Sequence, residues 1–129
     1  PHPVSCQDGK LPLLLVAEDT DSNFLLVSLM FRKEFDIVRA VNGEEAVRIC
    51  REMNPAAILM DIKMPVMDGF EAMRRIRAFD PAVPIVAVTA FAYDRDRQKA
   101  FAAGAKGYVA KPLSGEHIRR VLGTLLAEI

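Results

Sequence analysis

LLLVAED, residues 13–19, is an unbroken apolar run that ends in two acidic residues, Glu18 and Asp19. The run has the length of one strand and no polar residue on either face, which is typical of a parallel sheet covered on both sides. Polar side chains at the carboxyl end of such a strand lie where open α/β sheets bind ligands. The stretch therefore predicts a buried parallel strand with a polar site at its end.

The same arrangement recurs along the chain. Apolar runs at about 13–17, 35–38, 56–60, 83–88 and 107–110 alternate with helical stretches at about 21–33, 43–53, 68–79, 94–104 and 114–128. Five strand–helix pairs with short, right-handed connections require helices on both faces of the sheet. The predicted fold is α/β: a doubly wound (βα)5, flavodoxin-like three-layer sandwich with a parallel five-stranded sheet in the order 2-1-3-4-5.

Capping residues separate these elements. Asp21 or Ser22 is predicted to cap the first helix and Ser114 the fifth. Gly104 lies where glycine commonly follows a helix, just before the fifth strand. Each signal agrees with the division into alternating strands and helices.

The composition excludes several classes of protein. The 129 residues contain 17 Lys+Arg and 17 Asp+Glu, so the formal net charge is zero. A nucleic-acid-binding domain normally has a basic excess, and therefore no direct nucleic-acid contact is expected. No apolar run approaches the roughly 18 residues of a membrane span, so we expect no membrane contact by this domain.

The N-terminal segment and the two cysteines bear on the molecular context and the compartment of this chain. Residues 1–10 are polar and contain two prolines, which suggests a linker left by excision from a longer chain or an ordinary frayed terminus. Cys6 and Cys50 have neither disulfide-framework nor metal-site spacing. A reducing compartment, the cytoplasm, is expected because thiols stay reduced there.

Polar residues end the first, third, fourth and fifth predicted strands; they are Glu18 with Asp19, Asp61, Thr89 and Lys111. In the order 2-1-3-4-5 the first and third strands are neighbours, so the three carboxylates converge and the other two residues line the opposite side. Taken singly, each has an ordinary explanation, such as a helix cap or a solvated lysine. Their coincidence at four strand ends predicts one site.

Three adjacent carboxylates repel one another, and a divalent cation removes that conflict. Oxygen-only ligation favours Mg²⁺ over zinc, which would require His or Cys. A carboxylate at such a site can attack phosphorus and form an aspartyl-phosphate. Asp61 is the predicted acceptor because its strand is central, while Thr89 and Lys111 would neutralise phosphoryl oxygens.

From about Leu13 to its C-terminus the chain resembles the receiver domain of two-component response regulators. The resemblance rests on VAED at 16–19, MDIKMPVMDG at 60–69, VTA at 88–90 and KGYVAKP at 106–112. It implies a receiver domain at 11–129. It also implies that Asp61 is the phosphoacceptor, and that Glu18, Asp19, Asp61 and the backbone carbonyl of Lys63 hold Mg²⁺.

The resemblance assigns further roles. Thr89 and Lys111 match the phosphate-sensing residues, Tyr108 matches the switch aromatic, and Lys111-Pro112 matches a cis peptide, which makes Pro112 the cis-proline. The implied donor is a phosphohistidine on a histidine kinase or a histidine phosphotransfer domain. The implied output is a changed surface of the fourth helix, fifth strand and fifth helix, which controls a partner or an attached output domain.

Several points stay open in the sequence. A receiver assists its own phosphorylation and dephosphorylation, so whether to class the chain as an enzyme is undecided. It is either a stand-alone protein or the cytoplasmic part of a membrane-bound hybrid histidine kinase. A flavin carrier would need a hydroxyl- and glycine-rich loop in place of EDTD at 18–21. An aspartyl phosphatase would have Asp instead of Lys63, and a degenerate receiver would lack part of the acidic set.

Two local features go beyond the family pattern. FLLVSLMF at 24–31 is apolar nearly all round, which indicates either a fully buried helix or an exposed docking patch for a phosphotransfer partner or a second subunit in a homodimer. Lys63 and Phe91 lie two residues after Asp61 and Thr89, where they would tune phosphoryl lifetime by controlling access of water; alternatively, Phe91 packs against the fourth helix.

Overall fold

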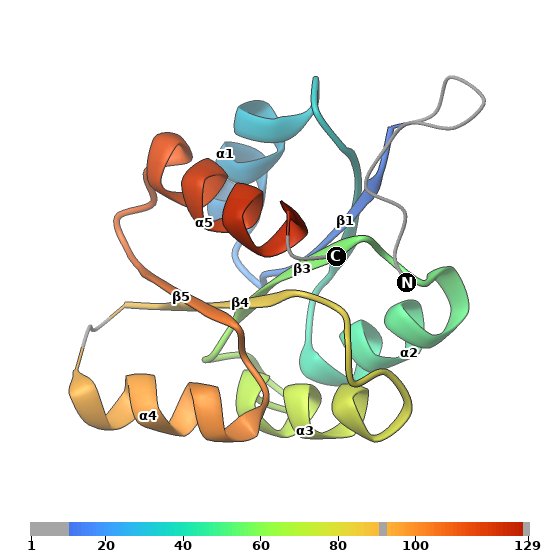
Figure 1. Cartoon of the computed structure of the whole chain (residues 1–129), viewed down its shortest axis with the longest axis vertical. Helices are drawn as coiled ribbons and strands as arrows, with labels where there is room; N and C mark the ends of the chain where they lie inside the picture. Colours follow the sequence, from blue (N-terminus) through green and yellow to red (C-terminus); the bar gives the residue numbers. More distant parts are fainter. Residues whose placement is uncertain (1–10, 91–92, 128–129) are drawn as a thin grey trace.

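The computed structural model describes residues 11–90 and 93–127. Five strands and five helices alternate along them (Figure 1): β1 (Leu13–Ala17), α1 (Asp21–Phe31), β2 (Asp36–Ala40), α2 (Gly43–Met53), β3 (Ala57–Asp61), α3 (Gly69–Phe79), β4 (Ile85–Thr89), α4 (Asp94–Ala103), β5 (Gly107–Ala110) and α5 (Gly115–Ala127). Among these described helices, none combines the length and apolar character that crossing a bilayer requires.

The five strands form one parallel sheet in the order β2-β1-β3-β4-β5, which confirms the predicted fold class. Helices α1 and α5 cover one face, while α2, α3 and α4 cover the other (Figure 1). Ala17 is level with Met60, and Asp61 with Val88. The carboxyl ends of β1, β3 and β4 therefore lie at one edge of the sheet.

Two apolar cores lie on the two faces of the sheet. Along β1 the side chains alternate, because successive residues of a strand point to opposite faces. Leu15 and Ala17 belong to the core beneath α2 and α3, whereas Leu14 and Val16 belong to the core beneath α1 and α5. All four are buried, so the apolar character of this run follows from burial on both faces.

The boundaries of the first helix and second strand differ from the predicted ones. Helix α1 begins after Thr20, whose side chain makes no capping hydrogen bond, so the expectation of a cap at Asp21 or Ser22 was wrong. Asp21 instead lies in the first turn and pairs with Arg39 of β2. Strand β2 begins and ends later than predicted. Its charged residues Asp36 and Arg39 interrupt the apolar run from which the strand was predicted.

The capping predictions at the other end of the chain are confirmed. The Ser114 hydroxyl accepts a hydrogen bond from the backbone N–H of His117 at 3.3 Å, at the start of α5. Gly104 ends α4 with a φ of 122°, a conformation that strongly favours glycine. The connections on both sides of β5 therefore follow from local sequence.

Gly69 lets α3 begin directly against the end of β3. Its N–H donates to the Ile62 carbonyl at 2.8 Å. A Cβ atom at this position would lie 2.4 Å from the carbonyl oxygen of Asp61 and 2.8 Å from the Cα of Ile62. Both neighbours are backbone, so a side chain cannot be accommodated by rotation of a flexible group.

We expect Gly69→Ala to lower the free energy of unfolding by about 1–3 kcal/mol, because α3 would have to move away from β3. Gly123→Ala is the matched control, since a Cβ at this exposed position of α5 meets nothing within 4 Å. That control should stabilise the protein by about 1 kcal/mol through helix propensity. Urea denaturation measures both, and equal effects would contradict the close approach at Gly69.

Candidate functional site

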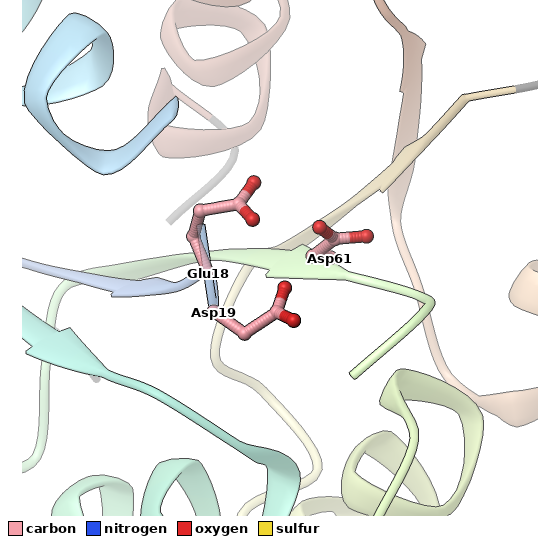
Figure 2. Close-up of side chains that lie close together, drawn as sticks. All are labelled: Glu18, Asp19 and Asp61. Atoms are coloured by element: carbon pink, nitrogen blue, oxygen red, sulfur yellow. The ribbon is translucent and has the colours of Figure 1, made fainter. Parts of the chain in front are cut away.

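Three carboxylates meet at the carboxyl edge of the sheet (Figure 2). Glu18 and Asp19 follow β1, and Asp61 is the last residue of β3. One oxygen from each carboxylate lies within 4.8 Å of the other two. Because β1 and β3 pair in parallel, residues 42 positions apart in the chain become neighbours, as the strand order predicts.

Lys111 reaches this cluster from the end of β5. Its Nζ donates to Asp61 Oδ2 at 3.1 Å and lies 3.4 Å from Glu18 Oε1. The other oxygen of Asp61, Oδ1, accepts a hydrogen bond from the backbone N–H of Lys63 at 3.1 Å. Both oxygens of Asp61 are therefore held in defined directions.

Burial makes the charges of this cluster interact strongly. Glu18 and Asp61 are 4% and 5% exposed, whereas Asp19 is exposed to solvent. Burial raises the pKa of Glu18, and the neighbouring charge of Asp61 raises it further. Burial alone would lower the pKa of Lys111, but its hydrogen bond to Asp61 and the two carboxylates raise it overall.

These residues fit a hard divalent cation. The candidate ligands are all oxygen atoms, and the cluster found among the described residues has three carboxylates, which leaves room for water and phosphoryl oxygens as Mg²⁺ prefers. The three carboxylates face the ammonium group of Lys111, so a cation with two charges would balance the negative charge that this pairing leaves. Such a cation would favour ionisation of Glu18, which burial opposes.

A groove of about 670 Å³ opens beside the cluster and extends toward α4. Asp19, Lys63 and Thr89 line it near the edge of the sheet, and Asp96 and Lys99 line it from α4. Thr89 ends β4 and is buried. The groove therefore connects the acidic edge of the sheet with one of its covering helices.

The remaining predicted site residues are distributed around this edge. Tyr108 is half-buried on β5 and packs against the core beneath α2 and α3. The Lys111–Pro112 peptide bond is cis. Lys63 is exposed, and Phe91 lies outside the described residues.

Sequence reasoning missed one residue that contacts the site. The Arg39 side chain on β2 donates from Nε to the Glu18 carbonyl at 3.1 Å. No spacing motif connects these two positions, and a single arginine in an edge strand normally indicates a solvated side chain. Only the pairing of β1 with β2 brings the two residues together.

Comparison with known families gives an independent finding. The family model described as "Response regulator receiver domain" matches residues 14–122. The match spans the sheet, all three carboxylates and Lys111, and it ends within α5. It therefore covers the whole site together with the fold that forms it.

Sequence comparison with individual proteins supports the same family. The chain is 33% identical to the chemotaxis protein CheY of Halobacterium salinarum over 114 residues, which are 88% of this chain and 95% of CheY. It is 34% identical to hybrid signal transduction histidine kinase I of Dictyostelium discoideum over 125 residues, covering 89% of this chain but 7% of the kinase.

A solved structure of a receiver domain is similar to this chain in both fold and sequence. The receiver domain of a sensor histidine kinase from Pseudomonas aeruginosa PAO1, solved with a magnesium ion coordinated in its active site cleft, superposes with a TM-score of 0.85. It is 34% identical to this chain, and the alignment covers 91% of this chain and 98% of that one. Fold, acidic edge and family match lead to one conclusion: the chain belongs to the response regulator receiver domains of two-component signalling.

Proposed function

We propose that this domain is a cytoplasmic phosphoacceptor switch in which Asp61 takes a phosphoryl group from a phosphohistidine of a histidine kinase or a histidine phosphotransfer domain. The observation that carries the proposal is the convergence on Asp61 of one ammonium group and two further carboxylates. A lysine–aspartate pair alone would need no additional acids. The acidic pair beside it supplies the site for a cation.

In the proposed transfer, a carboxylate oxygen of Asp61 attacks phosphorus as the phosphorus–nitrogen bond of the phosphohistidine breaks. The electron pair of that bond returns to the imidazole nitrogen, and the product is an aspartyl-phosphate. Glu18, Asp19, Asp61 and the carbonyl of Lys63 would hold Mg²⁺, which when bound neutralises carboxylate and phosphoryl charge. Lys111, already beside Asp61, would pair with a phosphoryl oxygen.

The output of the switch is proposed to pass through α4, β5 and α5. The buried residues of α4 are Ala100 and Ala103, both in its C-terminal half. Arg77 of α3 donates to the Gly104 carbonyl from Nε at 3.0 Å and Nη2 at 2.7 Å, which holds the C-terminal end of α4. Movement of Thr89 toward a phosphoryl group would shift the population of α4 positions about this held end.

Tyr108 is proposed to respond to the same movement, and Lys63 and Phe91 to set the lifetime of the phosphoryl group. Tyr108 is half-buried one strand away from Thr89, which is compatible with a change of rotamer. Lys63 is exposed at the groove beside Asp61, where it would affect the approach of hydrolytic water.

The donor domain is proposed to dock on the outer face of α1. Leu25, Leu26 and Leu29 are 57%, 43% and 55% exposed, whereas Val27 and Phe31 on the opposite side are buried. Full burial of this helix, one of the two explanations for its sequence, is therefore wrong. Because α1 directly follows the loop that carries Asp19, a partner seated on these leucines would lie beside the acidic edge.

Asp61→Asn should abolish phosphorylation by acetyl phosphate and Mg²⁺, because an amide oxygen is a far weaker nucleophile than a carboxylate. Asp68→Asn is the matched control: Asp68 is exposed, caps α3 and lines the same groove, and Asn is an equally good cap. Intact-protein mass spectrometry should find one phosphoryl group on the wild type and on the control. Phosphorylated Asp61→Asn, or an unreactive wild type, would contradict the assignment.

Glu18→Gln should stabilise the metal-free protein at neutral pH while weakening its binding of Mg²⁺. The raised pKa of Glu18 means that its stabilising contribution is present below the ordinary value of 4.5 and is lost as pH rises through the folded-state pKa. The stability advantage of the variant in EDTA should therefore disappear at low pH. Thermal unfolding as a function of pH measures this, with Glu44→Gln on the exposed face of α2 as the control.

Leu29→Glu should slow phosphotransfer from a phosphorylated histidine phosphotransfer domain about tenfold, because a charge would replace a desolvated apolar contact. Its rate with acetyl phosphate should not change. Met53→Glu, at a 48% exposed position on α2, is the control and should leave both rates unchanged. An unchanged transfer rate together with loss of a dimer would show that a second subunit occupies the patch instead.

A further inference from the structure

Arg39 contacts three groups of the segment that carries two of the candidate Mg²⁺ ligands. Its Nε donates to the Glu18 carbonyl at 3.1 Å, and its Nη1 lies 2.8 Å from Asp21 Oδ1. The guanidinium carbon is 4.9 Å from the centre of the Phe24 ring. A side chain of β2 thus contacts the chain beyond the end of β1, on both sides of Asp19 in the sequence.

The hydrogen bond from Arg39 to the Glu18 carbonyl takes the place of a backbone hydrogen bond between β1 and β2. The N–H of Glu18 donates to the Ala40 carbonyl at 2.9 Å, at the end of the pairing between β1 and β2. In a continuing parallel ladder, a later N–H of β2 would bond the Glu18 carbonyl. Strand β2 ends at Ala40, so the Arg39 side chain supplies the donor instead.

This carbonyl belongs to the peptide group that joins Glu18 to Asp19. Fixing its direction restricts rotation about the bonds on both sides, and so restricts the directions in which both acidic side chains leave the backbone. The loop has no side-chain cap from Thr20. The Thr20 N–H bonds Glu18 Oε2 at 3.1 Å, which uses a carboxylate that is itself a candidate ligand.

The burial of Arg39 separates it from an ordinary surface ion pair. Its side chain is 23% exposed, whereas that of Asp21 is 93% exposed, and such exposed pairs contribute little. Within the described part of the chain, the Arg39 Nη2 atom is buried and has no hydrogen-bond partner. Besides its exposed ion pair with Asp21, the guanidinium is therefore anchored by the Glu18 carbonyl and the Phe24 ring.

We propose that Arg39 is a positioning residue for the Mg²⁺ site, acting through the Glu18–Asp19 peptide group. The inference rests on the proposed function, because it assumes that these acids hold Mg²⁺. The charge of Arg39 and its positioning of the ligands predict opposite effects on Mg²⁺ affinity. A cation close to a metal site opposes binding by repulsion, whereas a side chain that orients two ligands favours it.

Titration calorimetry with MgCl₂ on the whole chain distinguishes the two effects. Arg39→Met should weaken Mg²⁺ binding about tenfold, the lower range for loss of a residue that orients metal ligands. Arg39→Lys retains the charge but lacks the planar fork of donors, so its affinity should be intermediate. Arg48→Met removes the same charge from an exposed position of α2 that pairs with Glu52, and should bind Mg²⁺ like the wild type.

Equal or tighter Mg²⁺ binding by Arg39→Met would overturn the proposal, since repulsion would then be the larger effect of Arg39. Thermal unfolding in EDTA establishes that each variant is folded. If Arg39→Met is unfolded, Arg39→Lys decides: weaker binding with an unchanged unfolding temperature supports positioning, and wild-type affinity overturns it. A wild type that takes up no Mg²⁺ would contradict the proposed metal site itself.

Discussion

The repulsion between Glu18 and Asp61 is the constraint on which the rest of the site depends. Both carboxylates are buried, and burial raises the pKa of Glu18 because its charged form loses hydration. Lys111 offsets only part of this negative charge. The folded domain therefore keeps an unfavourable arrangement of charge at the edge of its sheet, which binding of a divalent cation would relieve.

The sheet order makes that arrangement unavoidable for this sequence. Pairing of β1 with β3 brings the acidic residues together, and β4 and β5 place Thr89 and Lys111 beside them. Gly69 adds a second restraint, since α3 begins against the backbone of Asp61 itself. The start of α3 thus lies against the acidic edge, and the groove beside it is lined from both helices, by Phe70 of α3 and Lys99 of α4.

Much of this could be predicted from the sequence, because strands buried on both faces leave continuous apolar runs and parallel strands align their carboxyl ends. The fold and the convergence of the three carboxylates follow from those two facts. The cap of α1 was predicted wrongly: Asp21 lies in the first turn of the helix, where its carboxylate pairs with Arg39, a residue distant in the sequence. The contacts of Arg39 and the exposure of the α1 leucines could not be predicted either. Both depend on which segments pack against β2 and α1, and the local sequence does not specify this.

The separation between the exposed leucines of α1 and the acidic edge has an evolutionary consequence. Leu25 and Leu29 project from a helix whose opposite side is buried, and neither belongs to the carboxylate cluster. If the donor docks on these leucines, as proposed, one copy of a duplicated gene would acquire a new donor by exchanging these outer residues while its reaction stayed intact. Two copies would then be kept from accepting each other's donor by substitutions on one or two turns of a single helix, with the residues of the acidic site unchanged.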